Sequence, residues 1–373
     1  MHDVLIVGAG PAGLSAALAL RQAGAGVTVL EQHPSPRPRV CGAFINSEGA
    51  SHLEALGLMD RLSDVGAVPV TEARVTWPNG GDAVVPLVRG NRAGLAVPRP
   101  TLERVMADAV AAAGGTVRWG ARVRDAARSG NDWSVELVSG VTRRTLSAPW
   151  LVVADGRFSS LSGRHVLRSR AGWFGWNVSY VGVGQPPGAL SLHFCRDGYV
   201  GLLTFGDGVT NVCGLARFGL SGPIRWEEVL ASALREQKGL AHLMRSATRV
   251  DAFRGVGPLP FSRAMWEGSG PLLAGDAAAV GDPYMGEGIS RALGTGPALS
   301  AALAGGGPGA PSDAFVSRYN RLWRDRYHPR LWLGTAARWM FSRPRLAVPL
   351  LGHVVNRPFL LRVILSIAHG RRR

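Results

Sequence analysis

Cysteine is scarce in this chain of 373 residues. The three cysteines, Cys41, Cys195 and Cys213, are too few for a disulfide framework, and no C-x-x-C pair or cysteine–histidine spacing of a metal site occurs. The sequence therefore predicts no metal site. This cysteine usage favours a reducing, cytoplasmic environment.

Long apolar runs are missing as well. No run of about 18 apolar residues occurs, so no segment is expected to span a bilayer. The apolar N-terminus lacks the basic start of a signal peptide. Apolar residues still make up 46% of the chain, which excludes disorder and supplies a core for two domains or one large composite domain.

Lysine is nearly absent, since Lys238 is the only one, although the formal net charge is +16. Arginine therefore carries almost all of the positive charge, and it gathers near the C-terminus. From Arg318 to Arg373, thirteen arginines and one acid, Asp325, give +12. A charge this uneven needs a physical explanation.

The N-terminus carries the most informative pattern. Val4–Val7 predicts a buried parallel strand, Leu14–Ala23 a helix and Val27–Leu30 a second strand, with Glu31 at its end. This is a complete βαβ unit, and it predicts dinucleotide binding; the alternative is a glycine-rich turn in an ordinary α/β domain. The glycines with G-x-G-x-x-G spacing are Gly8, Gly10 and Gly13.

Each residue of this motif has a physical task. Gly8 permits the tight turn, Gly10 lets the backbone approach a pyrophosphate, and Gly13 lets the helix pack on the strand. The helix N-terminus offers unpaired N–H groups to phosphates. Glu31 can accept hydrogen bonds from a ribose hydroxyl.

Beyond this unit, helical and antiparallel patterns alternate. Helices are expected at Ser47–Leu56 with Ser47 as N-cap, from Leu102 to Val110, at Trp226–Arg235 and at Gly288–Ala304. The other patterns predict β-structure: a hairpin of Ala73–Trp77 and Ala83–Leu87 around Asn79-Gly80, a meander near Trp133–Val138, buried strands at Leu151–Ala154 and Gly270–Asp276, and an antiparallel sheet of Trp176–Val183, Leu190–Cys195, Tyr199–Phe205 and Asn211–Ala216.

Four motifs together carry a family resemblance: the N-terminal glycine motif with Glu31, Arg99 opening a helix, Asp155-Gly156, and Gly275-Asp276. In this order and at these separations, the chain resembles the flavoprotein superfamily that includes p-hydroxybenzoate-hydroxylase-like monooxygenases, geranylgeranyl reductases and flavin halogenases. The resemblance implies an α/β protein: an FAD-binding three-layer Rossmann-like domain, an inserted antiparallel β-sheet substrate domain and a helical C-terminal tail. The expected boundaries are 1–70, 97–165 and 265–305 for the composite FAD-binding domain, 71–96 and 166–264 for the substrate domain, and 306–373 for a basic, apolar helical C-terminal region.

The resemblance implies non-covalent FAD as the cofactor. Glu31 would hold the adenosine ribose, Arg99 would lie near the phosphates, and Asp276 would hold the ribityl or pyrophosphate region. Alternatively, Asp155 and Asp276 are strand-end caps and Arg99 is a surface charge. The residues implied at the cofactor are Gly8, Gly10, Pro11, Ala12, Gly13, Glu31, Gln32, Cys41, Gly42, Arg99, Val123, Asp155, Gly156, Gly275, Asp276, Pro283, Gly286, Gly288 and Ile289.

The segment Gly281–Ile289 resembles the part of the family that opens a helix toward the flavin. Its glycines would let backbone N–H groups approach the isoalloxazine carbonyls, and a helix dipole would stabilise negative charge there. Pro283 would form part of the substrate-side wall. Because Gly182–Gly188 contains two prolines and no following helix, it is not a second dinucleotide motif. NAD(P)H would therefore dock transiently, or another donor would supply the electrons.

Three residues are catalytic candidates. Cys41-Gly42 resembles a pair that lies near the flavin in the geranylgeranyl-reductase branch; the alternative is a small buried thiol. Tyr199 matches the first residue of that branch's Tyr-x-Trp-x-Phe-Pro pattern, whose other residues are absent, and the Trp-x-Trp-x-Ile-Pro pattern of halogenases is absent too. His193 is either an acid/base group facing the cavity or a structural histidine.

The resemblance favours an FAD-dependent monooxygenase that uses reduced flavin and O₂ on a hydrophobic small molecule of secondary metabolism, such as a polyketide, an aromatic compound or an isoprenoid. The alternative is a reductase of carbon–carbon double bonds in a prenyl or polyketide substrate. A non-catalytic flavin- or lipid-binding protein is a third hypothesis, and it would hold FAD that no donor can reduce.

The basic tail has two explanations. Pro344, Pro349 and Pro358 are expected to divide it into short apolar helices that pack on the FAD domain. Alternatively, the arginines bind an anionic membrane peripherally, at about 1 kcal/mol per basic residue near the surface. A purely internal helix would gain nothing from so many cations, which favours the second explanation. No nucleic-acid recognition motif accompanies the charge, so no nucleic-acid partner is expected.

Overall fold

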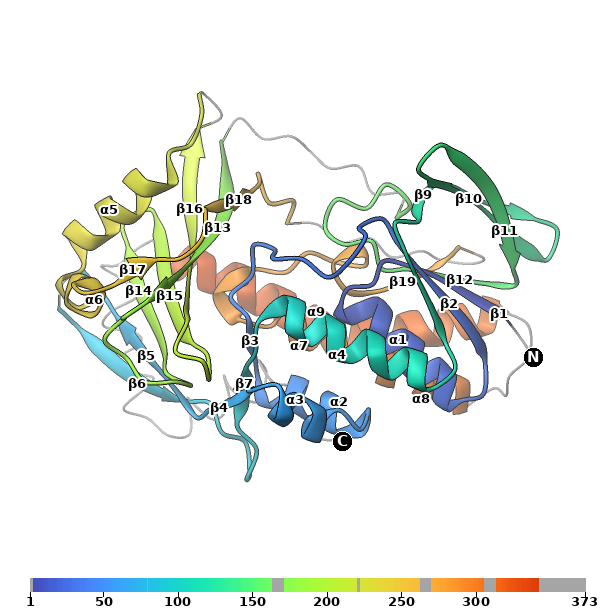
Figure 1. Cartoon of the computed structure of the whole chain (residues 1–373), viewed down its shortest axis with the longest axis horizontal. Coiled ribbons are helices and arrows are strands. Elements are labelled where there is room, and N and C mark those ends of the chain that lie inside the picture. Colours follow the sequence, from blue (N-terminus) through green and yellow to red (C-terminus); the bar gives the residue numbers. More distant parts are fainter. Residues whose placement is uncertain are drawn as a thin grey trace.

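The computed structural model describes residues 3–78, 80–162, 171–219, 222–261, 270–304 and 313–341. Two large β-sheets stand side by side, and most of the long helices lie between and beneath them (Figure 1). One sheet is parallel and belongs to the N-terminal βαβ unit. The other is mainly antiparallel.

The parallel sheet has the strand order β19-β12-β1-β2-β8. Helix α1 (Pro11–Gln22) and helix α4 (Arg99–Ala112) pack on one face of it. An antiparallel meander of β9 (Arg122–Ser129), β10 (Asp132–Ser139) and β11 (Thr142–Ala148) packs on the other, which gives the expected three layers. The strands of the sheet are β1 (Asp3–Val7), β2 (Gly26–Glu31), β8 (Thr116–Trp119), β12 (Trp150–Val153) and β19 (Leu272–Leu273).

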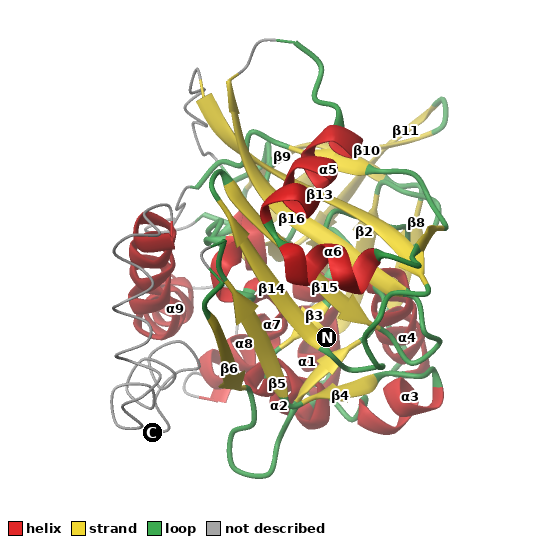
Figure 2. Ribbon diagram, turned by 90° about the vertical axis from the view of Figure 1, so that its left-hand side faces the viewer, coloured by secondary structure: helices red, strands yellow, loops and turns green. Residues whose placement is uncertain are grey.

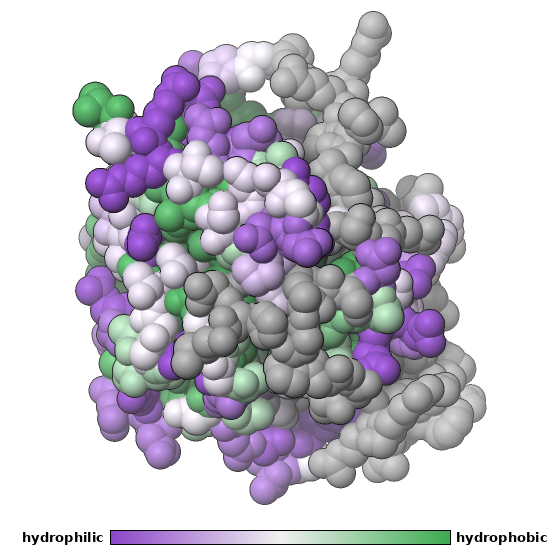
Figure 3. All heavy atoms as spheres, turned by 90° about the vertical axis from the view of Figure 1, so that its right-hand side faces the viewer, coloured by the Kyte–Doolittle hydropathy of each residue, from purple (hydrophilic) through white to green (hydrophobic). Residues whose placement is uncertain are grey.

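Burial explains why this part of the sequence folds as it does. The residues of Val4–Val7 are at most 6% exposed, as a central strand covered on both faces requires. Trp133, Val135 and Leu137 alternate along β10 and join the same core, while the residues between them are only partly buried. Seen from the parallel-sheet side, hydrophilic and apolar residues are interspersed over the described surface (Figure 3).

The second sheet has the order β17-β13-β16-β15-β14-β5-β6, and β18 pairs with β13. Its hairpin β5–β6 confirms the predicted hairpin, although Asn79 lies outside the described residues. Helices α5 (Trp226–Glu236) and α6 (Lys238–Met244) cover one face of this sheet (Figure 2). The strands are β5 (Glu72–Thr76), β6 (Asp82–Pro86), β13 (Ala171–Val181), β14 (Leu190–Cys195), β15 (Gly198–Thr204), β16 (Thr210–Gly219), β17 (Thr248–Arg249) and β18 (Arg254–Val256).

A small sheet links the two large ones. It has the order β3-β7-β4, from β3 (Phe44–Ile45), β7 (Gly94–Ala96) and β4 (Val68–Val70). Helix α2 (Ser47–Ala55) follows β3, and its N-cap is Asn46 rather than the predicted Ser47. The Asn46 carboxamide oxygen accepts a 3.0 Å hydrogen bond from the Gly49 N–H, a bond that asparagine and serine make equally well at this position. The short helices α3 (Met59–Asp64) and α6 are not predicted by the sequence analysis.

The single helix expected at Gly288–Ala304 is two helices, α7 (Gly288–Leu293) and α8 (Thr295–Ala304). At Gly294, between them, a side chain would lie 1.7 Å from the Tyr327 hydroxyl oxygen, so only glycine fits there. Tyr327 belongs to helix α9 (Asp313–Phe341), a continuous helix of 29 residues. The prolines expected to divide the tail, Pro344, Pro349 and Pro358, lie outside the described residues.

Candidate active site

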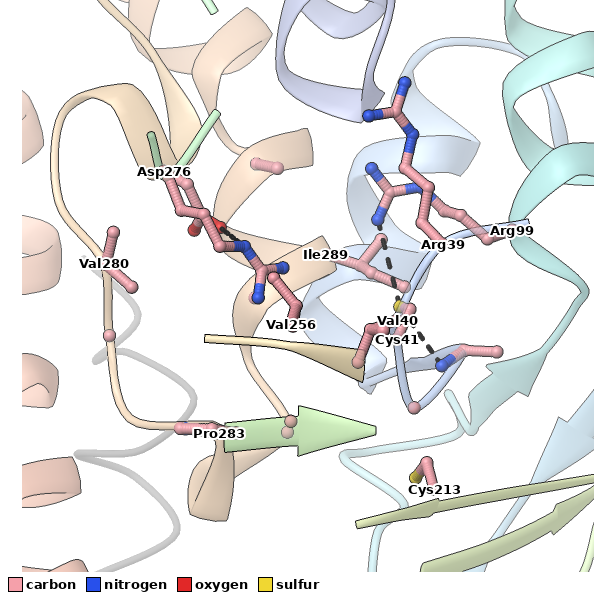
Figure 4. Close-up of a pocket in the computed structure, with 18 of the residues that line it drawn as sticks. Arg39, Val40, Cys41, Arg99, Cys213, Val256, Asp276, Val280, Pro283 and Ile289 are labelled. Atoms are coloured by element: carbon pink, nitrogen blue, oxygen red, sulfur yellow. Dashed lines mark hydrogen bonds and ion pairs between the residues drawn. The ribbon is translucent and has the colours of Figure 1, made fainter. Parts of the chain in front are cut away.

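A cavity of about 1310 Å³ lies where the parallel sheet meets the antiparallel one. Asp276, Val280 and Pro283 lie along one side of it, and Arg39, Arg99 and Cys41 along the other (Figure 4). All but three of the residues predicted at the cofactor or in catalysis line this cavity. The exceptions are Gly13, Gly275 and His193.

The glycine motif forms the polar end of the cavity. A Cβ atom on Gly8, whose φ is +104°, would lie 2.4 Å from the Ala154 carbonyl oxygen, and one on Gly13 would lie 1.9 Å from the Gly8 carbonyl oxygen. These two glycines are required by close packing. Gly10 differs, because its Cβ would have only the Arg99 guanidinium nearby, at 3.5 Å. Gly10 therefore leaves open space on the cavity side of the turn, where a pyrophosphate is expected.

Glu31 braces this turn from the end of β2. Its carboxylate accepts hydrogen bonds from the backbone N–H of Ala9 at 2.9 Å and of His33 at 3.0 Å. The Arg39 guanidinium lies 3.7 Å away. Each carboxylate oxygen has a second lone pair, so Glu31 can still accept a hydrogen bond from a hydroxyl group in the cavity.

Arg99 is held by a buried carboxylate. Its Nε atom donates a 2.7 Å hydrogen bond to Glu103, which is 1% exposed, and Arg39 approaches the same carboxylate at 4.0 Å. Burial lowers the pKa of Arg99, but the Glu103 carboxylate outweighs it and holds the pKa above its usual value. A permanently charged guanidinium thus lies beside Gly10, which contradicts the alternative that Arg99 is a free surface charge.

Asp276 lies across the cavity in the 3₁₀ turn η1 (Gly275–Ala277). It accepts a 3.0 Å hydrogen bond from Arg291 and lies 3.7 Å from Arg157. Gly275 packs on α1 instead of lining the cavity, since its Cβ would be 2.7 Å from the Cβ of Ala12. Asp276 therefore presents a carboxylate that is 26% exposed and already oriented by two guanidinium groups.

The opposite end of the cavity is an apolar chamber. The rings of Trp77 and Phe194 stack with their centres 5.9 Å apart. Phe194 stacks on Tyr284 with the same distance between ring centres and an interplanar angle of 6°. The ring centre of Tyr199 lies 5.0 Å from that of Tyr284. Aliphatic side chains of β5, β6, β14, β15 and their flanking residues complete the wall: Ala73, Val75, Val85, Leu87, Leu190, Leu192 and Leu203.

His193 does not face this chamber, which corrects one of its two interpretations. Side chains alternate along β14, so Leu192 and Phe194 line the cavity while His193 points to the opposite face of the sheet. There its ring nitrogens lie 2.8 Å from the Thr76 hydroxyl and 3.1 Å from the Ser191 hydroxyl. Burial lowers the pKa of His193 to about 4, so it is a neutral structural group at neutral pH.

Cys41 and Tyr199 do line the cavity. The Cys41 thiol accepts a hydrogen bond from the Ala43 N–H at 3.3 Å, and the Arg99 guanidinium lies 3.9 Å from the sulfur. Burial raises the pKa of Tyr199 well above 10, so its hydroxyl stays protonated. Cys213, which the sequence analysis assigned no role, lines the same cavity, and burial raises the pKa of its thiol to about 12.

Two acids in the segment Gly281–Ile289 are further cavity residues that sequence reasoning missed. Burial raises the pKa of Asp282 to about 6 and that of Glu287 to about 7. Glu287 stands between Gly286 and Gly288, both of which the resemblance assigned to the cofactor. The sequence feature that could have identified Glu287 as a site residue was therefore its position between two glycines assigned to the cofactor.

Helix α9 forms part of the wall through Leu333 and Ala336. Its cations have acidic partners: Arg326 and Arg330 donate hydrogen bonds to the buried carboxylate of Glu48 on α2. Arg338 lies 3.1 Å from Asp282, and its guanidinium stacks 4.0 Å from the centre of the Phe261 ring. The expectation that internal packing gains nothing from these cations is therefore wrong for these three arginines.

Within the described ranges, no group of three or more His, Cys, Asp or Glu residues is arranged to hold a metal ion. No helix in the same ranges is long and apolar enough to cross a membrane.

Comparison with known proteins places these features in context. Residues 1–174 match the FAD binding domain family. Menaquinone reductase of Mycolicibacterium smegmatis is 27% identical over 86% of this chain and 79% of that protein. Digeranylgeranylglycerophospholipid reductase 2 of Methanopyrus kandleri is 27% identical over 87% of this chain and 83% of that protein. Rifampicin monooxygenase of Rhodococcus hoagii is 30% identical, but over only 43% of this chain and 33% of that protein.

Solved structures share the fold at low sequence identity. The flavin-dependent brominase Bmp2 superposes with a TM-score of 0.82 over 99% of this chain and 94% of its own, at 18% identity. The p-nitrophenol 4-monooxygenase PnpA of Pseudomonas putida superposes with a TM-score of 0.78 over the whole of both chains, at 19% identity.

Proposed function

We propose that this chain, which belongs to the FAD-dependent oxidoreductases of the p-hydroxybenzoate hydroxylase and geranylgeranyl reductase superfamily, reduces double bonds in an elongated apolar small molecule of isoprenoid type. The observation that carries this proposal is the apolar chamber joined to a polar, glycine-lined cleft in one cavity. A cofactor with a dinucleotide end and a flat redox-active end matches that division.

The residues of the polar end fit FAD. The open space beside Gly10 and the guanidinium of Arg99 suit a pyrophosphate, and the carboxylates of Glu31 and Asp276 suit ribose and ribityl hydroxyl groups. FAD, when bound, supplies two-electron chemistry that no side chain provides. NAD(P)H docking transiently is the proposed source of electrons.

The substrate class follows from the chamber wall. The stacked rings of Trp77, Phe194 and Tyr284 and the aliphatic residues around them offer apolar surface, and the hydroxyls of Tyr199 and Tyr284 and the thiols of Cys41 and Cys213 are among the polar groups beside it. An ionised substrate would lose its hydration against this apolar surface. An apolar chain gains about 25 cal/mol for each Å² that it buries.

Reduction is favoured over oxygenation by the extent of the similarities. Two of the relatives that match over most of both chains are named as reductases of a quinone and of a lipid with geranylgeranyl chains. Oxygenation, which the sequence analysis preferred, remains the second candidate. It is supported by the similarity of 43% of this chain to rifampicin monooxygenase and by the apolar lining of the chamber.

One experiment separates the two. FAD-loaded protein is reduced anaerobically with dithionite, divided, and mixed either with a menaquinone bearing an unsaturated isoprenoid chain or with the same quinone plus O₂. The proposal expects, without O₂, a product whose isoprenoid chain gains two hydrogen atoms per reduced bond and keeps them after the quinone ring is reoxidised in air. A product that gains one oxygen atom, formed only with O₂, would establish the second candidate.

Peripheral membrane association is a separate proposal. It rests on the arginines of the C-terminal segment, and it would bring the cavity close to lipophilic substrates. The partners of Arg326, Arg330 and Arg338 reduce the charge available for it, so the arginines from Arg345 onward would carry most of the attraction.

A further inference from the structure

Glu287 is a buried acid in the wall of the cavity. It lies on the same short segment as Gly286 and Gly288, and its side chain lines the cavity that Gly10 and Cys41 also line. The residue is 6% exposed, and its Oε1 atom has no hydrogen-bond partner among the described residues. A carboxyl group in this situation is costly to ionise and is free to bind or release a proton.

A comparison with Glu48 shows why Glu287 differs from an ordinary buried ion pair. Both acids lie near Arg330, which interacts electrostatically with each. The hydrogen bonds of Arg326 and Arg330, however, go to Glu48. Burial raises the pKa of Glu48, but these guanidinium groups outweigh it and leave the pKa below its usual value. Glu48 is thus a fixed charge.

Glu287 has only the longer-range attraction of Arg330 and Arg291, opposed by the negative charge of Glu48. Burial is the largest influence and raises the pKa of Glu287 to about 7. Near neutral pH the carboxyl group is therefore divided between its two protonation states. A change of charge in the cavity will shift that balance.

We propose that Glu287 takes up a proton when the bound FAD is reduced and releases it when FAD is reoxidised. Reduction delivers two electrons from the donor and, near neutral pH, one proton to the isoalloxazine, which leaves one negative charge. That charge disfavours a second anion nearby, so the Glu287 carboxylate binds one proton from solvent and becomes a carboxylic acid. The sum is two electrons and two protons; reoxidation returns both protons.

The same coupling works in reverse. If reduction favours protonation of Glu287, then protonation must favour reduction to the same extent. A protonated acid then stands in the cavity wall when the reduced cofactor meets its substrate. The inference requires bound FAD, and it holds for reduction and oxygenation alike.

The other groups around Glu287 do not serve this role. His52 on α2 is neutral, because burial lowers its pKa to about 4, and burial raises the pKa of Tyr327 on α9 far above neutrality. Asp276 is paired with Arg291 and Arg157. Asp282 is the nearest rival, since burial raises its pKa to about 6, but Arg338 lies 3.1 Å from its carboxylate and lowers that pKa.

The test compares wild type, Glu287→Gln and the matched control Asp282→Asn, each purified with FAD. The midpoint potential of the flavin is measured across about two pH units on either side of neutrality, and proton uptake is counted with an indicator dye during anaerobic photoreduction in weak buffer. Toward lower pH the contribution of Glu287 should disappear, because its carboxyl group is already protonated before reduction; near and just above pH 7, wild type should take up more than one proton per two electrons. Glu287→Gln should take up less than wild type there, and Asp282→Asn should match wild type.

Three results would overturn the inference. Equal uptake by Glu287→Gln and wild type would place the extra proton on the flavin itself, and loss of uptake in Asp282→Asn alone would assign it to Asp282. If Glu287→Gln does not retain FAD, the reduced-minus-oxidised infrared spectrum of wild type decides the question, because absence of a new protonated-carboxyl band would contradict proton uptake by an acid. Failure of the proposed substrate reaction would leave all these readouts unchanged.

Discussion

The side-chain amide of Asn211, on strand β16, donates a 3.0 Å hydrogen bond to the backbone carbonyl oxygen of Cys41, in the loop after β2. Asn177 on β13 donates to the Asn211 amide oxygen at 3.1 Å and lies 3.3 Å from the carbonyl oxygen of Arg39. Both asparagines are at most 6% exposed. A pair of amides thus ties the loop that carries Cys41 to the sheet that forms the apolar chamber.

Removal of this tie should loosen the Cys41 loop. Asn211→Ala leaves a buried carbonyl oxygen without its donor, so we expect the free energy of unfolding to fall by about 1–3 kcal/mol. Cys41, released from the sheet, should react faster with iodoacetamide. Urea unfolding and mass-spectrometric alkylation rates measure the two effects. Asn131→Ala, in an exposed turn, is the control and should change neither; unaltered alkylation of Cys41 in Asn211→Ala would refute the tie.

The glycine motif gives a prediction with an internal control. Gly10→Val should reduce FAD affinity by about 100-fold or more, equivalent to about 3 kcal/mol, because the side chain fills the open space beside the turn. The apoprotein should keep its melting temperature, since a Cβ there meets only the Arg99 guanidinium at 3.5 Å. Gly13→Val should instead destabilise the apoprotein by roughly 1–3 kcal/mol or more, because its Cβ would lie 1.9 Å from a carbonyl oxygen. Fluorescence titration with FAD and thermal melts of both variants test this contrast.

Asp276 and Cys41 should have separable roles. Asp276→Ala removes a carboxylate from the cavity and should weaken FAD retention by roughly 10- to 100-fold, or about 1.4–3 kcal/mol. Cys41→Ser should retain FAD but alter turnover or the flavin midpoint potential. Equilibrium dialysis and potentiometry distinguish these outcomes. If neither variant changes flavin retention, potential or turnover, both placements are wrong.

The sequence was most informative where local chemistry and backbone geometry coincide. The glycine motif, Arg99 at a helix start and the strand alternation of 172–218 each depend on neighbours in the chain, and the corresponding strands and helices are present. The side of the sheet that His193 faces depends on which face α5 and α6 cover, and no residue near His193 specifies that. The division of the expected helix at Gly294 likewise depends on Tyr327, which lies 33 positions further along the chain.

The acids of the site were hidden for the same reason. Glu48 reads as an ordinary first-turn acid of a helix, and its ionisation is set by Arg326 and Arg330 from α9. Burial raises the pKa of Glu287, and Arg330, which lowers it from a distance, directs its hydrogen bonds to Glu48 instead. Net charge along the tail predicted a free basic surface, because a sequence count cannot pair cations with acids that lie almost 300 residues away.

Acid should destabilise the protein partly through His193. Its folded-state pKa of about 4 lies below the usual 6.5, so the unfolded chain binds the proton first as the pH falls. This contribution to stability is complete above about pH 6.5 and is lost between there and about pH 4, amounting to roughly 3 kcal/mol. His193→Gln should not show that loss. Glu287 and Asp282, whose pKa values are raised by burial, change the free energy of unfolding in the opposite direction as the pH falls, and they do so in both proteins. Urea unfolding at several pH values gives the difference; parallel curves for the two proteins would contradict the burial argument.

The C-terminal arginines should decide whether the protein binds membranes. Six arginines, from Arg345 to Arg373, are absent from a chain that ends near Arg343, and each contributes about 1 kcal/mol near an anionic surface. We expect the full chain to sediment with vesicles containing phosphatidylglycerol at low salt, and to be released when salt shortens the screening distance. The shortened chain, which keeps Arg326, Arg330 and Arg338 with their acidic partners, should stay in the supernatant, as should both forms with phosphatidylcholine vesicles. If the full chain also remains in the supernatant with anionic vesicles at low salt, the tail serves packing alone and the membrane proposal is wrong.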